Sequence, residues 1–241
     1  MVGVFYCVYF STFGIEYFML QIIQTNDGSP SLFNQTLGVT YHSRYGALQE
    51  SRHVFIHNGL HHVANTFGPN LSVFELGFGT GLNAVLSAHE AVKLGLSLHY
   101  TSIDIHPLDE SLYRQLPFNT IFDGSDFNCS QKILAAPWQS RQSITPAFSL
   151  QKIHGDMLSY IPDNFFHLVY FDAFDPETQP DMWQKSVFEK LFVAMHGEGV
   201  LVTYCAKGKV KRLLRAIGFE VQTLKGPPGK REMTRAIRPL K

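Results

Sequence analysis

The chain has 241 residues, 45% of them hydrophobic, which is enough to bury the core of one large α/β domain. Its formal net charge is zero, but residues 207–241 contain eleven Lys and Arg against two Asp and Glu, so the C-terminal end is a candidate surface for a polyanion. The three cysteines have no C-x-x-C spacing, which argues against a disulfide framework and a zinc site and favours a cytoplasmic location.

Residues 1–19 are apolar and aromatic, with Glu16 as their single charge. We expect them to form an apolar N-terminal extension before a single domain at residues 20–241. They lack the basic stretch and cleavage site of a signal peptide, and the apolar run is short for a membrane crossing. Because Met19 is an alternative start, residues 1–18 are either foreign to the natural protein or an added strand. A membrane anchor is the less favoured alternative.

Two elements are expected before residue 60. Residues 20–33 read as a β-hairpin around the turn residues 26–28, and residues 41–56 change to helical spacing. His57 and His61 then form an i, i+4 pair. No carboxylate or cysteine follows at metal-ligand spacing, so we expect a solvated helix face and no metal site.

The run SVFELGFGTGLN, residues 72–83, combines a strand pattern, three glycines and the start of a helix. Gly77, Gly79 and Gly81 permit positive φ and close approach of a ligand. With Glu75 before them, they depart from the G-x-G-x-x-G of nicotinamide sites and are similar to the first motif of S-adenosylmethionine (SAM) methyltransferases. The alternative is a glycine-rich turn that binds nothing.

Three later strand patterns each lead to an aspartate. Open α/β sheets bind ligands outside the carboxyl ends of their strands, so Asp172 and Glu75 should face one crevice. Asp104 ends the second strand and is a candidate for the two ribose hydroxyls, because a carboxylate offers two acceptor oxygens. Asp156 is a candidate for an adenine amino group or, equally, for a helix N-cap.

The remaining segments complete an alternating pattern. Residues 107–149 predict short helices and loops, with a lid as one reading, and residues 199–205 predict a buried strand. A basic helix over 207–217 and an antiparallel pair over 219–224 and 233–238 follow. Strands that alternate with helices indicate a doubly wound sheet.

Four stretches, FELGFGTGLN, YHSRYGALQESRHVFI, DAFDPETQPDMW and GKREMTRA, together make residues 20–238 similar to one enzyme family. The chain resembles the methyltransferase half of the bifunctional tRNA-modifying enzyme MnmC and its standalone counterpart, MnmD. The resemblance implies that residues 20–241 are a single SAM-dependent methyltransferase domain with an α/β class I methyltransferase (Rossmann-like) fold, a mostly parallel seven-stranded sheet and an N-terminal β-hairpin. It also implies methyl transfer from SAM to the aminomethyl nitrogen of 5-aminomethyl-2-thiouridine at the tRNA wobble position. No flavin domain and no membrane partner are expected.

The resemblance also implies roles for particular residues. Asp172 matches the aspartate of the catalytic crevice. The residues that would hold SAM are Glu75, Gly77, Gly79 and Gly81, with Asp104 at its ribose and Asp156 at its adenine end.

The acceptor raises a question of proton transfer. An ordinary aspartate is about six pKa units more acidic than an alkyl ammonium. We therefore expect Asp172 to bind and orient the amine rather than to act as a strong base. Tyr170, Phe174 and Trp183 are candidates to stack on the flipped base, and each has a place in the core as its alternative. Candidate phosphate contacts are Lys209, Arg212, Lys230 and Arg231.

Two other functions fit parts of the pattern. Asp172 and Asp175 form a D-x-x-D that a polyamine (spermidine) synthase-like aminopropyltransferase would use to hold an amine. The basic C-terminal end favours RNA over a polycation, which it would repel. The other alternative is a non-catalytic RNA-binding module on the same fold.

Overall fold

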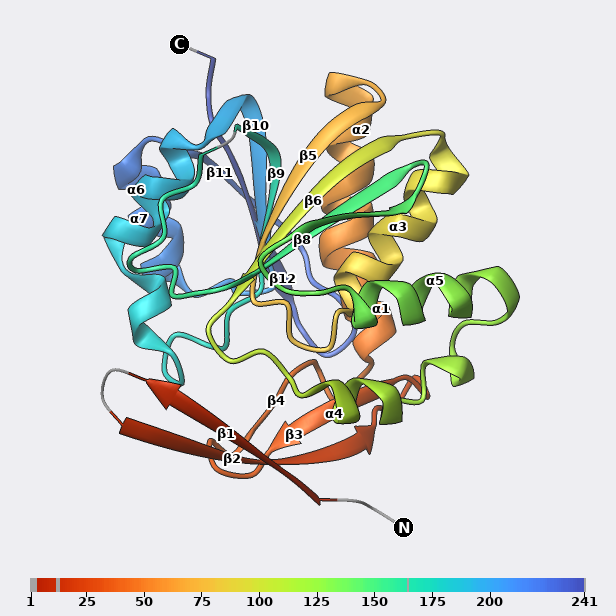
Figure 1. The fold of residues 1–241 in the computed structure, drawn as a ribbon. Helices are drawn as coiled ribbons and strands as arrows, with labels where there is room; N and C mark the ends of the chain where they lie inside the picture. The colour runs from red at the N-terminus through yellow and green to blue at the C-terminus, as the bar shows by residue number, and fades with distance from the viewer. Residues whose placement is uncertain (1–3, 12–13, 164, 241) are drawn as a thin grey trace.

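The computed structural model describes residues 4–11, 14–163 and 165–240, and among them an eight-stranded sheet forms the centre of the molecule (Figure 1). The strand order is β11-β12-β10-β9-β5-β6-β8-β7. The five strands from β10 to β8 are parallel, and β12, β11 and β7 run antiparallel to their neighbours. The strands are β5 (Asn70–Leu76), β6 (Ser97–Asp104), β7 (Arg141–Thr145), β8 (Phe148–His154), β9 (Phe166–Phe171), β10 (Met195–Thr203), β11 (Glu220–Lys225) and β12 (Glu232–Ile237).

This sheet confirms the predicted fold class, with one strand more than the seven expected. The addition is the edge strand β7, which lies in the segment where we expected helices and loops alone. Only Ile144 of β7 is buried, so the strand has no alternating apolar pattern from which it could be recognised. The predicted C-terminal pair is confirmed as β11 and β12.

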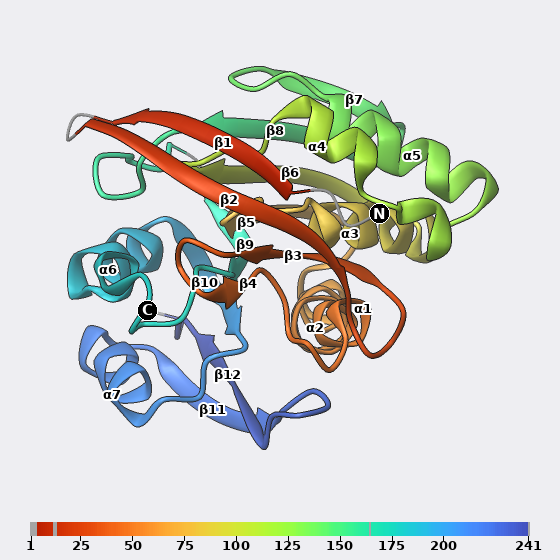
Figure 2. The ribbon, with the colours of Figure 1, turned by 90° about the horizontal axis from the view of Figure 1, so that it is seen from below.

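Helices cover both faces of the sheet (Figure 2). The helices on one face are α1 (Ala47–Ser51), the π-helix η1 (Arg52–Leu60), α2 (His61–Phe67), α3 (Leu82–Leu94) and α5 (Gly124–Ala135), with α4 (Glu110–Gln115) and the 3-10 turn η2 (Phe118–Thr120) beside them. The helices on the other face are α6 (Lys185–Val193), α7 (Gly208–Ile217) and the 3-10 turn η3 (Pro180–Trp183). The apolar run of β9 is explained by burial on both faces of the sheet. Leu168 and Tyr170 pack into one core layer, and Val169 and Phe171 pack into the other.

The helix expected over residues 41–56 begins later and extends further. It starts at Ala47 and continues through η1 and α2 to Phe67, while residues 41–46 form a loop. Gly59 in η1 packs closely on the sheet, since a Cβ there would lie 3.1 Å from Val202 and 3.2 Å from Tyr170.

A second, four-stranded antiparallel sheet lies across the carboxyl ends of the central strands (Figures 1 and 2). Its strands are β1 (Val4–Ser11), β2 (Gly14–Gln24), β3 (Pro30–Asn34) and β4 (Val39–Thr40). The predicted hairpin is confirmed as β2 and β3. Asp27 in its turn accepts a hydrogen bond from the Gln49 amide of α1, which ties the small sheet to the helical layer. Within the described part of the chain, no helix has the length and apolarity to cross a membrane.

Candidate cofactor and acceptor site

The glycine turn between β5 and α3 is shaped by contacts within the chain. Gly77, Gly79 and Gly81 have φ of +91°, +49° and +78°, values that disfavour other residues. A Cβ on Gly77 would lie 3.0 Å from the Asp172 carbonyl oxygen, and one on Gly81 would lie 2.7 Å from Leu134 Cδ2. Gly77 therefore lets the turn lie directly against the end of β9, and Gly81 lets it lie against α5.

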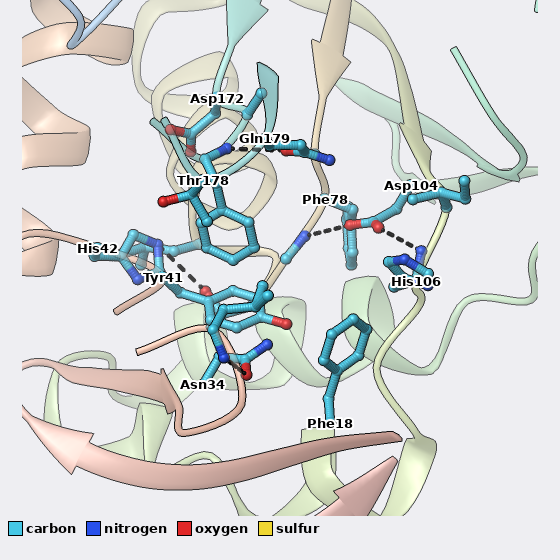
Figure 3. Close-up of a pocket in the computed structure, with 18 of the residues that line it drawn as sticks. Phe18, Asn34, Tyr41, His42, Phe78, Asp104, His106, Asp172, Thr178 and Gln179 are labelled. Carbon is cyan, nitrogen blue, oxygen red and sulfur yellow. Dashed lines mark hydrogen bonds between the residues drawn. The ribbon is translucent and has the colours of Figure 1, made fainter. Parts of the chain in front are cut away.

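A cavity opens between this turn and the small sheet, and we call it the cofactor cavity after the role that the sequence predicts for its residues (Figure 3). Its lining includes Gly77, Phe78, Gly79, Asn83, Asp104 and Asp172 from the central sheet, and Phe18, Asn34, Tyr41 and His42 from the N-terminal part. Asp104 accepts hydrogen bonds from the amides of Gly79 at 3.0 Å and His106 at 2.9 Å. These two bonds fix its carboxylate and leave lone pairs for further donors.

Asp156 lies in the wall of a smaller neighbouring cavity, which shares Gly77, Asp104, Ile105, Ala173 and Gln179 with the cofactor cavity. One Asp156 oxygen accepts a hydrogen bond from the Leu158 amide at 2.8 Å. The side chain thus stabilises a turn and also lies in the cavity wall.

A second cavity, the acceptor cavity, lies on the other side of Asp172. Its lining includes residues 38–44, Glu50, residues 172–175, Tyr204 and Lys230. The two cavities share Tyr41, His42, Asp172, Ala173, Phe174 and Thr178. Asp172 therefore lies where they meet.

Asp172 is linked to Glu75 beneath this junction. The Asn83 Nδ2 atom donates to Asp172 Oδ2 at 2.9 Å and to Glu75 Oε1 at 3.1 Å, and Ser102 Oγ donates to Glu75 Oε2 at 2.8 Å. Burial raises the pKa of Glu75 to about 8. Burial, and then the neighbouring Glu75, raise the pKa of Asp172 well above its usual range.

Two expectations about these acids change. Glu75 does not reach the crevice: it is fully buried, it lines neither cavity, and its carboxyl oxygens bind Asn83 Nδ2 and Ser102 Oγ. The raised pKa of Asp172 brings it closer to the pKa of an alkyl ammonium. Proton transfer from the amine to Asp172 therefore costs less than the sequence predicts for an ordinary aspartate.

Lys230 does not reach outward as a free phosphate contact. Its Nζ lies 2.6 Å from Glu50 Oε2 and 3.9 Å from the centre of the Tyr204 ring, inside the acceptor cavity. Glu50, 5% exposed, also accepts a hydrogen bond from the Ser43 amide. Lys209, Arg212 and Arg231 are exposed and have no ion pair among the described residues.

The aromatic candidates fall into two groups, one that lines the cavities and one that lies in the core. Phe174 lies in the wall of both cavities and meets Tyr41 edge to face, with the ring centroids 5.1 Å apart. Trp183 is 6% exposed, packs on Phe171 and donates its Nε1 hydrogen to the Phe174 carbonyl. Tyr170 is fully buried. The core alternative is therefore correct for Trp183 and Tyr170.

His42 and Glu50 are cavity residues to which the sequence gave no definite role. Their signal is the YHSRYGALQE stretch, for which the sequence predicts a helix from residue 41. Residues 41–46 instead form a loop beside the cavities, and Glu50 lies in α1. His42 Nδ1 lies 2.9 Å from Ser31 Oγ, and burial lowers the pKa of His42 to about 4. The imidazole is therefore neutral at neutral pH.

The histidine pair on the helix lies outside both cavities. His61 Nε2 is 2.8 Å from Glu90 Oε2, and its ring centroid is 5.9 Å from that of His57. Across the described ranges, no group of three or more His, Cys, Asp or Glu side chains is arranged to hold a metal ion.

The order of the central sheet and the glycine turn at its centre agree with the class I methyltransferase fold that the sequence predicts. The family model described as "S-adenosyl-L-methionine-dependent methyltransferase" matches residues 128–239. The predicted class and fold are thereby confirmed.

Within this class, the chain is similar to one part of bifunctional proteins named "tRNA 5-methylaminomethyl-2-thiouridine biosynthesis bifunctional protein MnmC". The relative from Methylobacillus flagellatus is 32% identical over 222 residues, which cover 88% of this chain and 34% of the relative. The relative from Chromobacterium violaceum is 31% identical over 220 residues, covering 86% and 33%. The chain thus spans about a third of the length of these curated relatives.

A solved structure agrees at the level of the fold. MnmC2 from Aquifex aeolicus superposes with a TM-score of 0.73 and 22% identity, covering 92% of this chain and 73% of that chain. The resemblance predicted from the sequence is confirmed.

Proposed function

We propose that this chain transfers a methyl group from SAM to the aminomethyl nitrogen of 5-aminomethyl-2-thiouridine at the wobble position of tRNA. The observation that carries the proposal is the junction of two cavities at Asp172. A donor and an acceptor that enter from opposite sides would meet there, and holding them in line supplies much of the rate of such a transfer.

The cofactor cavity fits SAM by the chemistry of its donors and acceptors. Asp104 would accept the ribose hydroxyls, and the turn at Gly77 and Gly79 would lie against the ligand. Asp156 would meet the adenine end in the neighbouring cavity. Glu75 and Gly81 support the site from within the chain rather than touching the ligand. Bound SAM would supply an electrophilic methyl group on a sulfonium.

The acceptor amine must offer a lone pair. A new N–C bond forms as the S–CH₃ bond breaks, the sulfur keeps the electron pair, and the nitrogen loses one proton. Asp172 would orient the amine, and its raised pKa suits it to take that proton before release to solvent. Phe174 would stack on the flipped uridine, and Lys209, Arg212 and Arg231 would contact phosphates.

Aminopropyl transfer is not favoured. Asp175, the second acid of the D-x-x-D, pairs with Lys207 at 2.6 Å, and Lys207 also binds Glu177 at 2.7 Å. An acid already neutralised in this way is poorly suited to hold a cationic polyamine.

The direct test is transfer of labelled methyl from SAM to tRNA that carries the unmethylated aminomethyl wobble uridine. Fully modified tRNA is the control. Asp172→Ala should abolish turnover while SAM affinity stays within a few fold. Normal methylation by this variant would remove Asp172 from the mechanism, and SAM binding with no transfer to any wobble-modified tRNA would favour the non-catalytic alternative.

A further inference from the structure

Glu75 is a carboxyl group buried beneath the junction of the two cavities. It is 0% exposed, and its oxygens accept hydrogen bonds from Asn83 Nδ2 and Ser102 Oγ. Both donors are neutral, and in the described part of the chain no lysine or arginine forms an ion pair with Glu75. The hydrogen bonds lower the Glu75 pKa in part, but no cation there offsets the cost of burying a full negative charge.

The groups around Glu75 are themselves acidic. The amide that binds it also binds Asp172, so two carboxyl groups share one nitrogen atom. Tyr100 and Asp104 of β6 and Tyr170 of β9 are the other titratable groups near Glu75. Asp172 also faces Glu50, Tyr204 and the cation Lys230, and Lys230 favours the ionised form of Asp172. Two carboxyl groups so close together are stabilised when one of them keeps its proton.

The geometry indicates which carboxyl group that is. Asp172 opens into the cavities, whereas Glu75 is sealed under α3. One buried acceptor of the same cluster, Asn83 Oδ1, has no hydrogen-bond partner among the described residues. A carboxylic acid, unlike a carboxylate, can donate a hydrogen bond to such an acceptor.

We propose that Glu75 is a positioning residue that stays protonated and, through Asn83, holds Asp172 as the one carboxylate that faces the acceptor amine. The role at Asp172 rests on the proposed function, whereas the protonation of Glu75 does not. Burial that raises the pKa of Glu75 to about 8 agrees with it. A neutral Glu75 also removes the negative neighbour that would otherwise oppose the ionisation of Asp172.

The first test needs no activity. The infrared spectrum of the whole chain at pH 7 should contain the carbonyl band of an un-ionised carboxylic acid, and Glu75→Gln should remove it. Ser102→Ala is a matched control that takes one hydrogen bond from the same group and should shift the band without abolishing it. No band, or a band that persists in Glu75→Gln, would overturn the protonation.

Stability against pH tests the same point. The unfolded chain ionises Glu75 above its ordinary pKa of 4.5, while the folded chain keeps the proton up to about pH 8. The folded state then binds more protons, so this group lowers stability as pH rises through that interval. The Tm of Glu75→Gln relative to wild type should therefore climb by several degrees between pH 5 and pH 8. A constant difference would contradict the proposal.

Methyl transfer then tests the positioning. Gln resembles the protonated acid, so Glu75→Gln should lose no more than about tenfold in kcat, whereas Glu75→Ala and Asn83→Leu should lose about 100-fold as Asp172 becomes misplaced. SAM affinity, measured separately, should change far less than kcat in Glu75→Ala. Equal losses in Glu75→Gln and Glu75→Ala would mean that the anion is required. A wild-type protein that methylates no such tRNA would refute the proposed function, while the infrared band and the Tm profile would still decide the protonation.

Discussion

Glu50 and Lys230 form an ion pair in the wall of the acceptor cavity, and its two members differ in exposure. The Glu50 side chain is 7% exposed and the Lys230 side chain is 32% exposed. Lys230→Met should lower the free energy of unfolding by about 3 kcal/mol, because it leaves a buried carboxylate unpaired. The double variant Glu50→Gln/Lys230→Met should recover most of this loss in urea unfolding. If the double variant is no more stable than Lys230→Met, the pair is not coupled.

The buried His42 makes the stability of the folded chain depend on pH in the acid range. The folded chain holds the His42 pKa at about 4, below the ordinary 6.5, so the unfolded chain binds the extra proton first. This contribution to stability is present above pH 6.5 and is lost as pH falls towards 4. The stability lost by pH 4 is about 3 kcal/mol. His42→Asn should therefore lose less stability than wild type between pH 6.5 and pH 4.5 in urea unfolding. His99→Asn, at an exposed histidine, is the control and should follow wild type.

At the scale of elements, the loop between β11 and β12 connects the C-terminal hairpin to the wall of the acceptor cavity. Gly229 has φ of +83°, and a Cβ there would lie 2.1 Å from the Tyr45 ring. Gly28 has the same φ but faces open space, with Gln24 Nε2 at 4.0 Å as its nearest neighbour. Changing either glycine to alanine should lower stability by about 1–2 kcal/mol through backbone strain.

Only Gly229→Ala should also affect tRNA, because the new methyl group displaces Tyr45, which is 57% exposed beside the cavity residue Arg44. Steady-state kinetics should show kcat/KM for tRNA reduced several-fold in Gly229→Ala and unchanged in Gly28→Ala, with SAM affinity the same in both. Equal kinetics in the two variants would separate this loop from acceptor binding.

The elements that the sequence predicted well are those with a strong local signal. The apolar run of β9 and the glycine turn before α3 follow from burial on two faces and from positive φ. The sequence predicts helix at residues 41–46, which form a loop. Apolar spacing does not indicate where a helix begins, and Gly46 has no capping side chain to mark the start.

The sequence predicts the positions of the two site aspartates well and the positions of the other site side chains less well. Asp104 and Asp172 follow from the rule that ligands lie at the carboxyl ends of parallel strands. The rule does not say to which side of a strand a residue points, so Glu75 was placed in the crevice although it lies under α3. The sequence predicts a surface cation at Lys230, because its partner Glu50 is 180 residues away in sequence.

At the scale of the whole molecule, the positive charge available to a partner comes from the cations that are not held in ion pairs. Lys207, Lys211 and Lys230 are neutralised by Asp175, Glu232 and Glu50, so they add little to an outward field. The exposed cations that remain include Lys209 and Arg212 of α7, which begins directly after the residue that binds Asp175 in the acceptor cavity wall. We therefore expect the anticodon stem and loop to lie along α7 while the wobble base enters the cavity.

Lys209→Glu/Arg212→Glu should weaken tRNA binding at least tenfold, because it removes two phosphate contacts and adds repulsion. It should also reduce the slope of log Kd against log salt by about one to two units, since each contact releases a counterion. Lys132→Glu/Arg141→Glu makes the same change of charge at α5 and β7, and it should alter the slope by much less. Filter binding across a salt series measures both. If the two double variants lose equal affinity and slope, net charge alone explains the effect, and tRNA does not bind along α7.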